Sequence, residues 1–233
     1  MNRFLKSLLL VLLIMTAAAP VGAKASEFQV TRFSGPDESH HSYFINGLAS
    51  AIPAVGYGLR NLSRNLRGRH YSYVTPVEST VPVQISVIAD IRKRYARNPA
   101  AKFNLVGVSY GGNIATLIAQ QLKLYRIPVN YLAVLDAPAP VSITSNVHRV
   151  DNFYCRQFGC IGQKVRLAWG NRSTIKQEFK VRSGHIKLSA ASLVEDRITG
   201  QLSEITMDLT PSPADPGTSA LGYSDEPIKL GAQ

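Results

Sequence analysis

The sequence contains few of the residues that build disulfide scaffolds and metal sites. Its 233 residues include two cysteines and five histidines. Two cysteines are too few for a disulfide-dense domain or a four-cysteine zinc site. The histidines show no HExxH spacing or other paired-ligand spacing. We therefore expect no structural metal.

Charged residues are also scarce, and acidic residues are the scarcer kind. Only 18% of the chain is charged and 45% is hydrophobic, with 26 Lys and Arg against 15 Asp and Glu. This composition excludes a disordered or collagen-like chain and indicates one globular domain. The positive charge raises the question of nucleic acid, but the arginines lie on expected helix faces without interleaved aromatic residues or a known nucleic-acid motif. We expect no nucleic-acid partner.

The apolar run near the N-terminus is too short to cross a membrane. Residues 8–14 are apolar, follow Arg3 and Lys6, and precede the sequence Ala23-Lys24-Ala25. A spanning helix needs about 20 apolar residues, whereas basic residues, a short apolar run and a small-x-small site are typical of a cleaved signal peptide. We expect residues 1–25 to be this signal peptide, with a permanent anchor as the alternative. The mature protein would then be secreted or periplasmic.

Export affects the interpretation of the two cysteines. Cys155 and Cys160 are separated by four residues, and disulfides form and persist in oxidising compartments. We expect a disulfide between them, with two free thiols as the alternative.

Hydrophobic periodicity predicts alternating short strands and amphipathic helices, which is typical of an α/β fold with a mostly parallel sheet. From residue 137 to residue 181 the apolar segments are short, and we expect one or two strands and loops there. One domain is expected at 26–208, followed by a flexible tail at 209–233. The expected strands are 28–33, 42–45, 71–74, 103–108 and 129–135, and the expected helices are 55–66, 83–95, 114–122 and 188–205.

One motif lies between an expected strand and an expected helix. The sequence Gly107-Val108-Ser109-Tyr110-Gly111 has the GxSxG pattern of a nucleophile elbow, a tight turn that exposes a serine hydroxyl at the start of a helix. The residues two positions before and two positions after the serine must be small, because a side chain there would collide with the neighbouring strand or helix. Gly107 and Gly111 meet this requirement. The alternative is a glycine-rich turn that only packs closely.

A nucleophilic serine needs a base, and the base needs an acid to orient it. In folds with this elbow the acid and then the histidine follow the serine along the chain. Asp136 ends the expected strand 129–135, and His185 precedes the last expected helix next to Gly184. Asp151 is the alternative acid, and we rank it second.

The oxyanion hole of such a site uses two backbone N–H groups. One belongs to the residue after the nucleophile, here Tyr110. The second comes from the loop after an early strand, here Asn46-Gly47-Leu48, so we expect Leu48 to supply it. An ordinary Asn-Gly turn is the alternative interpretation of this loop.

Together these residues resemble the α/β-hydrolase superfamily, and within it the small exported members related to lipases, esterases and thioesterases. The resemblance extends over about 42–206. It implies a three-layer sandwich in which helices flank a mostly parallel sheet, with minimal or no cap domain, because only 48 residues separate Asp136 from His185. It differs from many members in having Asn-Gly instead of His-Gly in the early loop.

The resemblance implies a serine hydrolase that cleaves carboxylic ester or thioester bonds through Ser109, His185 and Asp136 without a cofactor. Its substrate would be an acyl ester or thioester. The alternative function is a catalytically inactive binding protein with the same fold, whose basic surface engages anionic lipid or polysaccharide. We expect the basic helix faces to be solvated surface, with docking on an anionic membrane or polysaccharide surface as the alternative.

Overall fold

The computed structural model describes residues 39–47, 57–66, 68–71, 76–157 and 159–207. The predicted signal peptide, the predicted strand at 28–33 and the predicted tail lie outside the described residues. The elements, in chain order, are β1 (His40–Ile45), α2 (Tyr57–Asn65), β2 (Arg69–Tyr71), α3 (Pro76–Arg97), β3 (Lys102–Val108), α4 (Tyr110–Leu124), β4 (Val129–Leu135), β5 (Ser142–Ile143), β6 (Val147–Cys155), β7 (Arg166–Leu167), β8 (Ile175–Val181), the 3-10 turn η2 (Leu188–Ala190) and α5 (Ser192–Met207).

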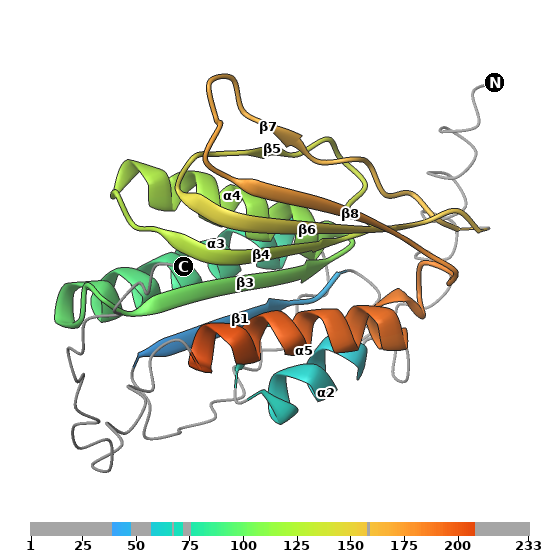
Figure 1. Cartoon of the computed structure of the whole chain (residues 1–233), viewed down its shortest axis with the longest axis horizontal. Helices are drawn as coiled ribbons and strands as arrows, with labels where there is room; N and C mark the ends of the chain where they lie inside the picture. The colour runs from blue at the N-terminus through green and yellow to red at the C-terminus, as the bar shows by residue number, and fades with distance from the viewer. Residues whose placement is uncertain (1–38, 48–56, 67, 72–75, 158, 208–233) are drawn as a thin grey trace, which may run out of the picture.

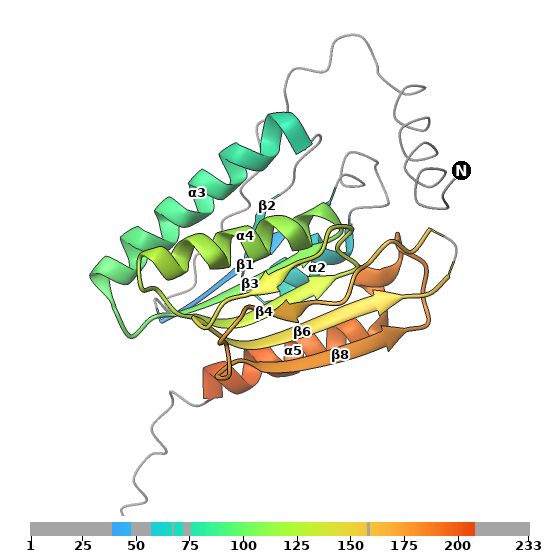
Figure 2. The same ribbon diagram turned by 90° about the horizontal axis from the view of Figure 1, so that it is seen from above.

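Six strands form one sheet in the order β2-β1-β3-β4-β6-β8. Every pair of neighbouring strands in it is parallel. A parallel sheet has to be covered on both faces, and here α3 and α4 cover one face while α2 and α5 cover the other (Figures 1 and 2). The structure is therefore a three-layer sandwich, as predicted from the sequence.

The helices pack on the sheet through side chains at helical spacing. On α3, Val83, Val87 and Ile91 are fully buried, each four residues from the next, which places them on one face of the helix. This helix ends at Arg97, two residues beyond the predicted end at 95 and directly before Asn98 and Pro99. Among the described residues, none of the helices combines the length and the apolar character that a membrane crossing requires.

The segment 137–181 contains more strands than predicted. It has four strands rather than one or two: β6 and β8 extend the main sheet, and β5 and β7 form a separate two-stranded sheet. The prediction was wrong because β5 and β7 have two residues each, too few to show a period. In β6 the buried polar side chains of Asp151 and Asn152 interrupt the apolar pattern.

Candidate active site

The carboxyl ends of the parallel strands bring the predicted site residues together. Asn46 follows β1, Ser109 follows β3 and Asp136 follows β4. His185 lies four residues beyond the end of β8. Because the strands are parallel, these positions lie at one edge of the sheet, which is where open α/β sheets place their sites.

Ser109 has the backbone conformation that a nucleophile elbow requires. Its φ is 56° and its ψ is −129°, a region that non-glycine residues rarely occupy and that has to be held by surrounding structure. The Ser109 N–H donates to the carbonyl oxygen of Leu135 at 2.8 Å. Helix α4 begins at the next residue, Tyr110, so the serine stands at the positive end of the helix dipole.

The elbow glycines are required by close packing. A Cβ atom at Gly107 would collide with the backbone of Gly111, and a Cβ atom at Gly111 would collide with the carbonyl oxygen of Ile45. Strands β1 and β3 and helix α4 therefore meet at distances that only glycine permits. The predicted steric reason for the motif agrees with these contacts.

Ser109, His185 and Asp136 form a continuous chain of hydrogen bonds. The Nδ1 atom of His185 lies 2.6 Å from Oδ2 of Asp136, and its Nε2 atom lies 3.1 Å from Oγ of Ser109. A carboxylate accepts only, so Nδ1 carries the proton in this pair and Nε2 is left to accept the hydroxyl proton. The Asp136 carboxylate is fully buried and the histidine side chain is 16% exposed.

The Asp136 carboxylate is surrounded by donors. Its Oδ1 atom accepts from the N–H of Gly162 at 2.9 Å and from that of Cys155 at 3.3 Å, and its Oδ2 atom accepts from the N–H of Ile161 at 3.1 Å. Burial by itself raises the pKa of Asp136, but the hydrogen bonds from His185, Ile161 and Cys155 outweigh it, so the pKa lies below its ordinary value. The group is held as a carboxylate at neutral pH.

The structure does not bring Asp151, the alternative acid, to His185. Asp151 lies within β6 rather than at its end. Its Oδ2 atom accepts from Nε of Arg197 at 2.8 Å and from the hydroxyl of Tyr131 at 3.1 Å. Asp151 therefore belongs to a buried ion pair between the sheet and α5, and Asp136 is the carboxylate in contact with the histidine.

One of the two predicted oxyanion donors lies in the described part of the chain. The backbone N–H of Tyr110 belongs to the first turn of α4, where N–H groups have no partner within the helix. The second predicted donor, Leu48, lies outside the described residues. Its neighbour Gly47 lies against Ser109, because a Cβ atom at Gly47 would be 2.6 Å from Cβ of Ser109.

The sequence analysis missed a histidine that supports this loop. The Nδ2 atom of Asn46 is hydrogen-bonded to Nε2 of His70 on β2, and both side chains are buried. Burial, with the charges of Arg60 and Arg64, lowers the pKa of His70 to about 4. A neutral His70 thus holds the residue before Gly47. Only the pairing of β1 with β2 brings the two side chains together, so no sequence motif marks them.

A groove of about 250 Å³ begins at Tyr110, the residue that follows Ser109. It runs between the exposed face of α4 and the segment that leads from Asp136 to β5. A hydrogen bond of 3.1 Å from Asn113 Nδ2 to the carbonyl oxygen of Ala139 joins the two walls. Most of its surface is apolar, and the residues that line it include Tyr110, Asn113, Leu117, Ala139, Pro140 and Val141.

A disulfide joins Cys155 and Cys160, as predicted, with 5.5 Å between their Cα atoms. Among the described residues, these cysteines and Asp136 are the one group of His, Cys, Asp and Glu side chains close enough to share a metal ion. Metals bind cysteine as the thiolate, and the two sulfur atoms are bonded to each other. The group therefore does not suit a metal ion.

No protein-family model matches the sequence, and no match is found among curated proteins. Solved structures resemble the chain in fold. An arylesterase structure has a TM-score of 0.50 at 11% identity, over 84% of this chain and 90% of the arylesterase. A serine hydrolase without a lid from Xanthomonas campestris has a TM-score of 0.47 at 12% identity, over 84% and 100% of the two chains.

A third similar structure is RedJ, a thioesterase from the prodiginine biosynthetic pathway of Streptomyces coelicolor. Its TM-score is 0.44 at 12% identity, over 84% of this chain and 95% of RedJ. At these identities the likeness concerns the fold and not the substrate. The likeness to the arylesterase, together with the parallel six-stranded sheet and the helices on both of its faces (Figure 2), shows that the chain has the α/β-hydrolase fold.

Proposed function

We propose that the chain is a serine hydrolase that cleaves carboxylic ester or thioester bonds. One observation carries this proposal: Ser109 Oγ, His185 and Asp136 are joined by hydrogen bonds of 3.1 and 2.6 Å. A serine, a base and an orienting acid in this order are the arrangement that activates a hydroxyl for acyl transfer. Nothing in the proposed reaction requires a cofactor.

The reaction has two halves. Ser109 attacks the carbonyl carbon of the substrate while Nε2 of His185 takes the hydroxyl proton, and the proton then goes to the leaving alcohol or thiol. Water then attacks the acyl-enzyme while Nε2 of His185 takes a proton from it, and this proton goes to Oγ of Ser109 as the acid is released. Asp136 keeps Nδ1 protonated and stabilises the imidazolium. The backbone N–H of Tyr110 stabilises the negative oxygen at the helix N-terminus.

The acyl part of the substrate is expected to be apolar. Tyr110 supplies both the expected oxyanion donor and one end of the groove along α4. A carbonyl bound at Ser109 can therefore direct its chain into the groove beside Leu117 and Val141. Burying apolar chain there is favourable by about 0.8 kcal/mol for each methylene.

The experiment is intact-mass detection of a fluorophosphonate adduct on the purified protein. We expect one adduct on the wild type and none on Ser109→Ala or His185→Ala. Ser145→Ala, which alters an exposed serine outside the site, is the matched control and is expected to label fully. A folded wild-type protein that forms no adduct would overturn the proposal.

The alternative function, an inactive binding protein, would then be favoured. Arg92, Lys93 and Arg97 are exposed at the end of α3, and exposed cations of this kind attract anionic surfaces. Sedimentation with anionic vesicles at low and high salt measures such binding, which should weaken as salt rises.

We also propose that the protein is exported. The signal-peptide pattern of residues 1–25 and the disulfide Cys155–Cys160 support export, because disulfides persist outside the reducing cytosol. Expression of the full sequence in a host with a secretion pathway tests this proposal. A product that begins at Ser26 outside the cytoplasm is expected, and full-length protein retained in the cytoplasm would contradict it.

A further inference from the structure

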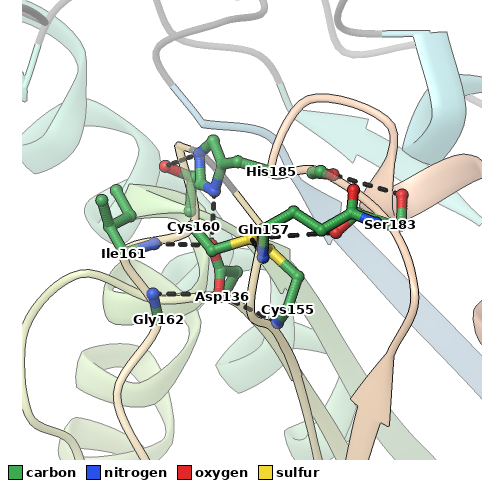
Figure 3. Close-up of a disulfide and its surroundings, with 10 residues drawn as sticks. Asp136, Cys155, Gln157, Cys160, Ile161, Gly162, Ser183 and His185 are labelled. Carbon is green, nitrogen blue, oxygen red and sulfur yellow. Dashed lines mark hydrogen bonds and ion pairs between the residues drawn. A yellow bond between two sulfur atoms is a disulfide. The ribbon is translucent and has the colours of Figure 1, made fainter.

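Three of the four hydrogen bonds to the Asp136 carboxylate come from Cys155, in a small covalent ring, and from the two residues that follow this ring. The ring is closed by the disulfide between Cys155 and Cys160. One donor is the N–H of Cys155 itself, and the other two belong to Ile161 and Gly162, the residues that follow Cys160. Figure 3 shows the disulfide beside this carboxylate.

The disulfide connects a rigid part of the fold to an irregular one. Cys155 is the last residue of β6 and is 2% exposed. Residues 159–165 belong to no helix or strand, so no ladder of hydrogen bonds holds Ile161 and Gly162 at the carboxylate. Besides the disulfide, this segment is tied at its far end, by hydrogen bonds from the N–H of Gln163 to the carbonyl oxygen of Ala137 at 2.9 Å and from Asn152 Nδ2 to the carbonyl oxygen of Gln163 at 3.4 Å. An ion pair of 3.1 Å joins Lys164 to Glu178.

Gly162 is fitted to the carboxylate. A Cβ atom at this position would collide with the Asp136 side chain and would lie 2.6 Å from its Cα atom. Only glycine allows the Gly162 N–H to approach Oδ1 while Ile161 donates to Oδ2. The Asp136 carboxylate is therefore closely surrounded by backbone N–H donors.

The same disulfide borders the segment that carries the base. Cys160 Sγ lies 3.7 Å from the carbonyl oxygen of Ser183, and the N–H of Gln157 donates to that sulfur at 3.1 Å. Ser183 is two residues before His185, and Figure 3 shows both beside the disulfide. One covalent bond thus lies next to the supports of both the acid and the base.

We propose that the Cys155–Cys160 disulfide, together with Ile161 and Gly162, is the device that positions Asp136 for His185, so that hydrolysis depends on the oxidised state of this bond. The inference rests on the proposed hydrolase function. These are positioning residues, because they act on the reaction through Asp136. Ser109 is held separately by β3 and α4, so substrate binding should not depend on the disulfide.

The first test replaces both cysteines and measures the hydrolysis of p-nitrophenyl butyrate. In Cys155→Ala/Cys160→Ala we expect kcat to fall by about 10- to 100-fold, the size of effect that misplaced catalytic groups produce, while KM changes little. Arg156→Ala is the matched control, since Arg156 is exposed, lies inside the ring and donates nothing to the carboxylate. A kcat of the double variant within twofold of the wild type would overturn the proposal.

Chemical reduction gives a second measurement on the unaltered sequence. The chain has two cysteines, so dithiothreitol reduces this one disulfide to two thiols. The dithiothreitol is itself oxidised to a cyclic disulfide. Wild-type kcat should fall on reduction and recover on reoxidation with oxidised glutathione. The double variant should not respond. An equal response of both proteins, or no response of the wild type once mass spectrometry shows two thiols, contradicts the proposal.

Gly162→Ala keeps the test decisive if the double variant does not fold. It leaves the disulfide in place and adds a methyl group that would collide with the Asp136 side chain. The carboxylate should therefore move away from His185, so kcat should fall while KM is retained. Full kcat in this variant contradicts the proposal. Failure of the proposed function looks different, because the oxidised wild type itself would then show neither turnover nor a fluorophosphonate adduct.

Discussion

Replacing Asp136 and Asp151 by asparagine, one at a time, should separate the acid of the site from a structural carboxylate. Both side chains are fully buried, and each follows the serine along the chain. Asp136 contacts His185 at 2.6 Å, whereas Asp151 contacts Arg197 at 2.8 Å. Asp136→Asn therefore removes the carboxylate that contacts His185, and Asp151→Asn removes the one that contacts Arg197.

In Asp136→Asn we expect kcat to fall by about 10⁴-fold. The amide NH₂ group cannot accept the Nδ1 proton, so the imidazole shifts to the tautomer that carries its proton on Nε2. That nitrogen then faces Ser109 as a donor and cannot take the hydroxyl proton. Binding of the substrate is unchanged by this shift, so KM should stay near its wild-type value.

In Asp151→Asn we expect kcat within about threefold of the wild type and a loss of about 2–3 kcal/mol in the free energy of unfolding. Breaking a buried ion pair costs about 3–5 kcal/mol. The cost should be smaller here, because the Arg197 side chain is 28% exposed and keeps its hydrogen bond of 2.6 Å to Gln177. The melting temperature should then fall by several degrees.

The assays are p-nitrophenyl butyrate hydrolysis at saturating substrate, well below both melting temperatures, and urea unfolding followed by circular dichroism. The reasoning is refuted if folded Asp151→Asn loses more than about 100-fold in kcat while Asp136→Asn remains active, because a factor of that size is typical of a lost catalytic group. That result would make Asp151 the acid.

Two further predictions concern the loop after β1. The pKa of His70 is about 4 in the folded chain and about 6.5 when unfolded, so the unfolded state binds more protons between these values and stability falls as pH drops from 6.5 to 4, by up to about 3 kcal/mol. Urea unfolding at pH 5 and pH 7 should show about 2 kcal/mol of this loss in the wild type and none of it in His70→Gln, and equal losses in both would contradict it. Gly47→Ala places a methyl group 2.6 Å from Cβ of Ser109, and kcat should fall by about 100-fold. Gly200→Ala, whose added Cβ atom would meet nothing within 4 Å, is the control and should keep full activity in the same assay. Full activity of Gly47→Ala would contradict the reasoning.

The central part of the fold could be predicted because its sequence signals agree with one another. The predicted strand 129–135 has the bounds of β4, Val129–Leu135, since six of its seven residues, all but Asn130, are hydrophobic and buried, as expected of a strand covered on both faces. The elbow could be predicted because the tight turn has room only for glycine at positions 107 and 111. Its place at a strand end ranked Asp136 above Asp151, and the structure brings Asp136 to the histidine. Their catalytic roles stay predictions.

The supports of the site could not be predicted, for a physical reason. Asp136 is held by backbone N–H groups, which nearly every residue type possesses, so the sequence carries no mark of the donors. Asn46 and His70 are 24 residues apart and meet only through the parallel pairing of two strands. In β8 only Val181 of the seven residues is buried, so the strand shows no alternation of apolar and polar residues in the sequence.

Strand β8 also bears on how separate copies of the chain behave. It is a seven-residue strand at the end of the sheet, and an open strand edge of this length can pair with the edge of another molecule. Alternate residues Lys176, Glu178 and Lys180 carry charge, and Glu178 is paired with Lys164 and Lys176 at 3.1 Å. Charges on an edge strand discourage such pairing, because an added strand would have to desolvate them. Variants that replace these lysines with β-branched apolar residues would expose the sheet to edge-to-edge aggregation.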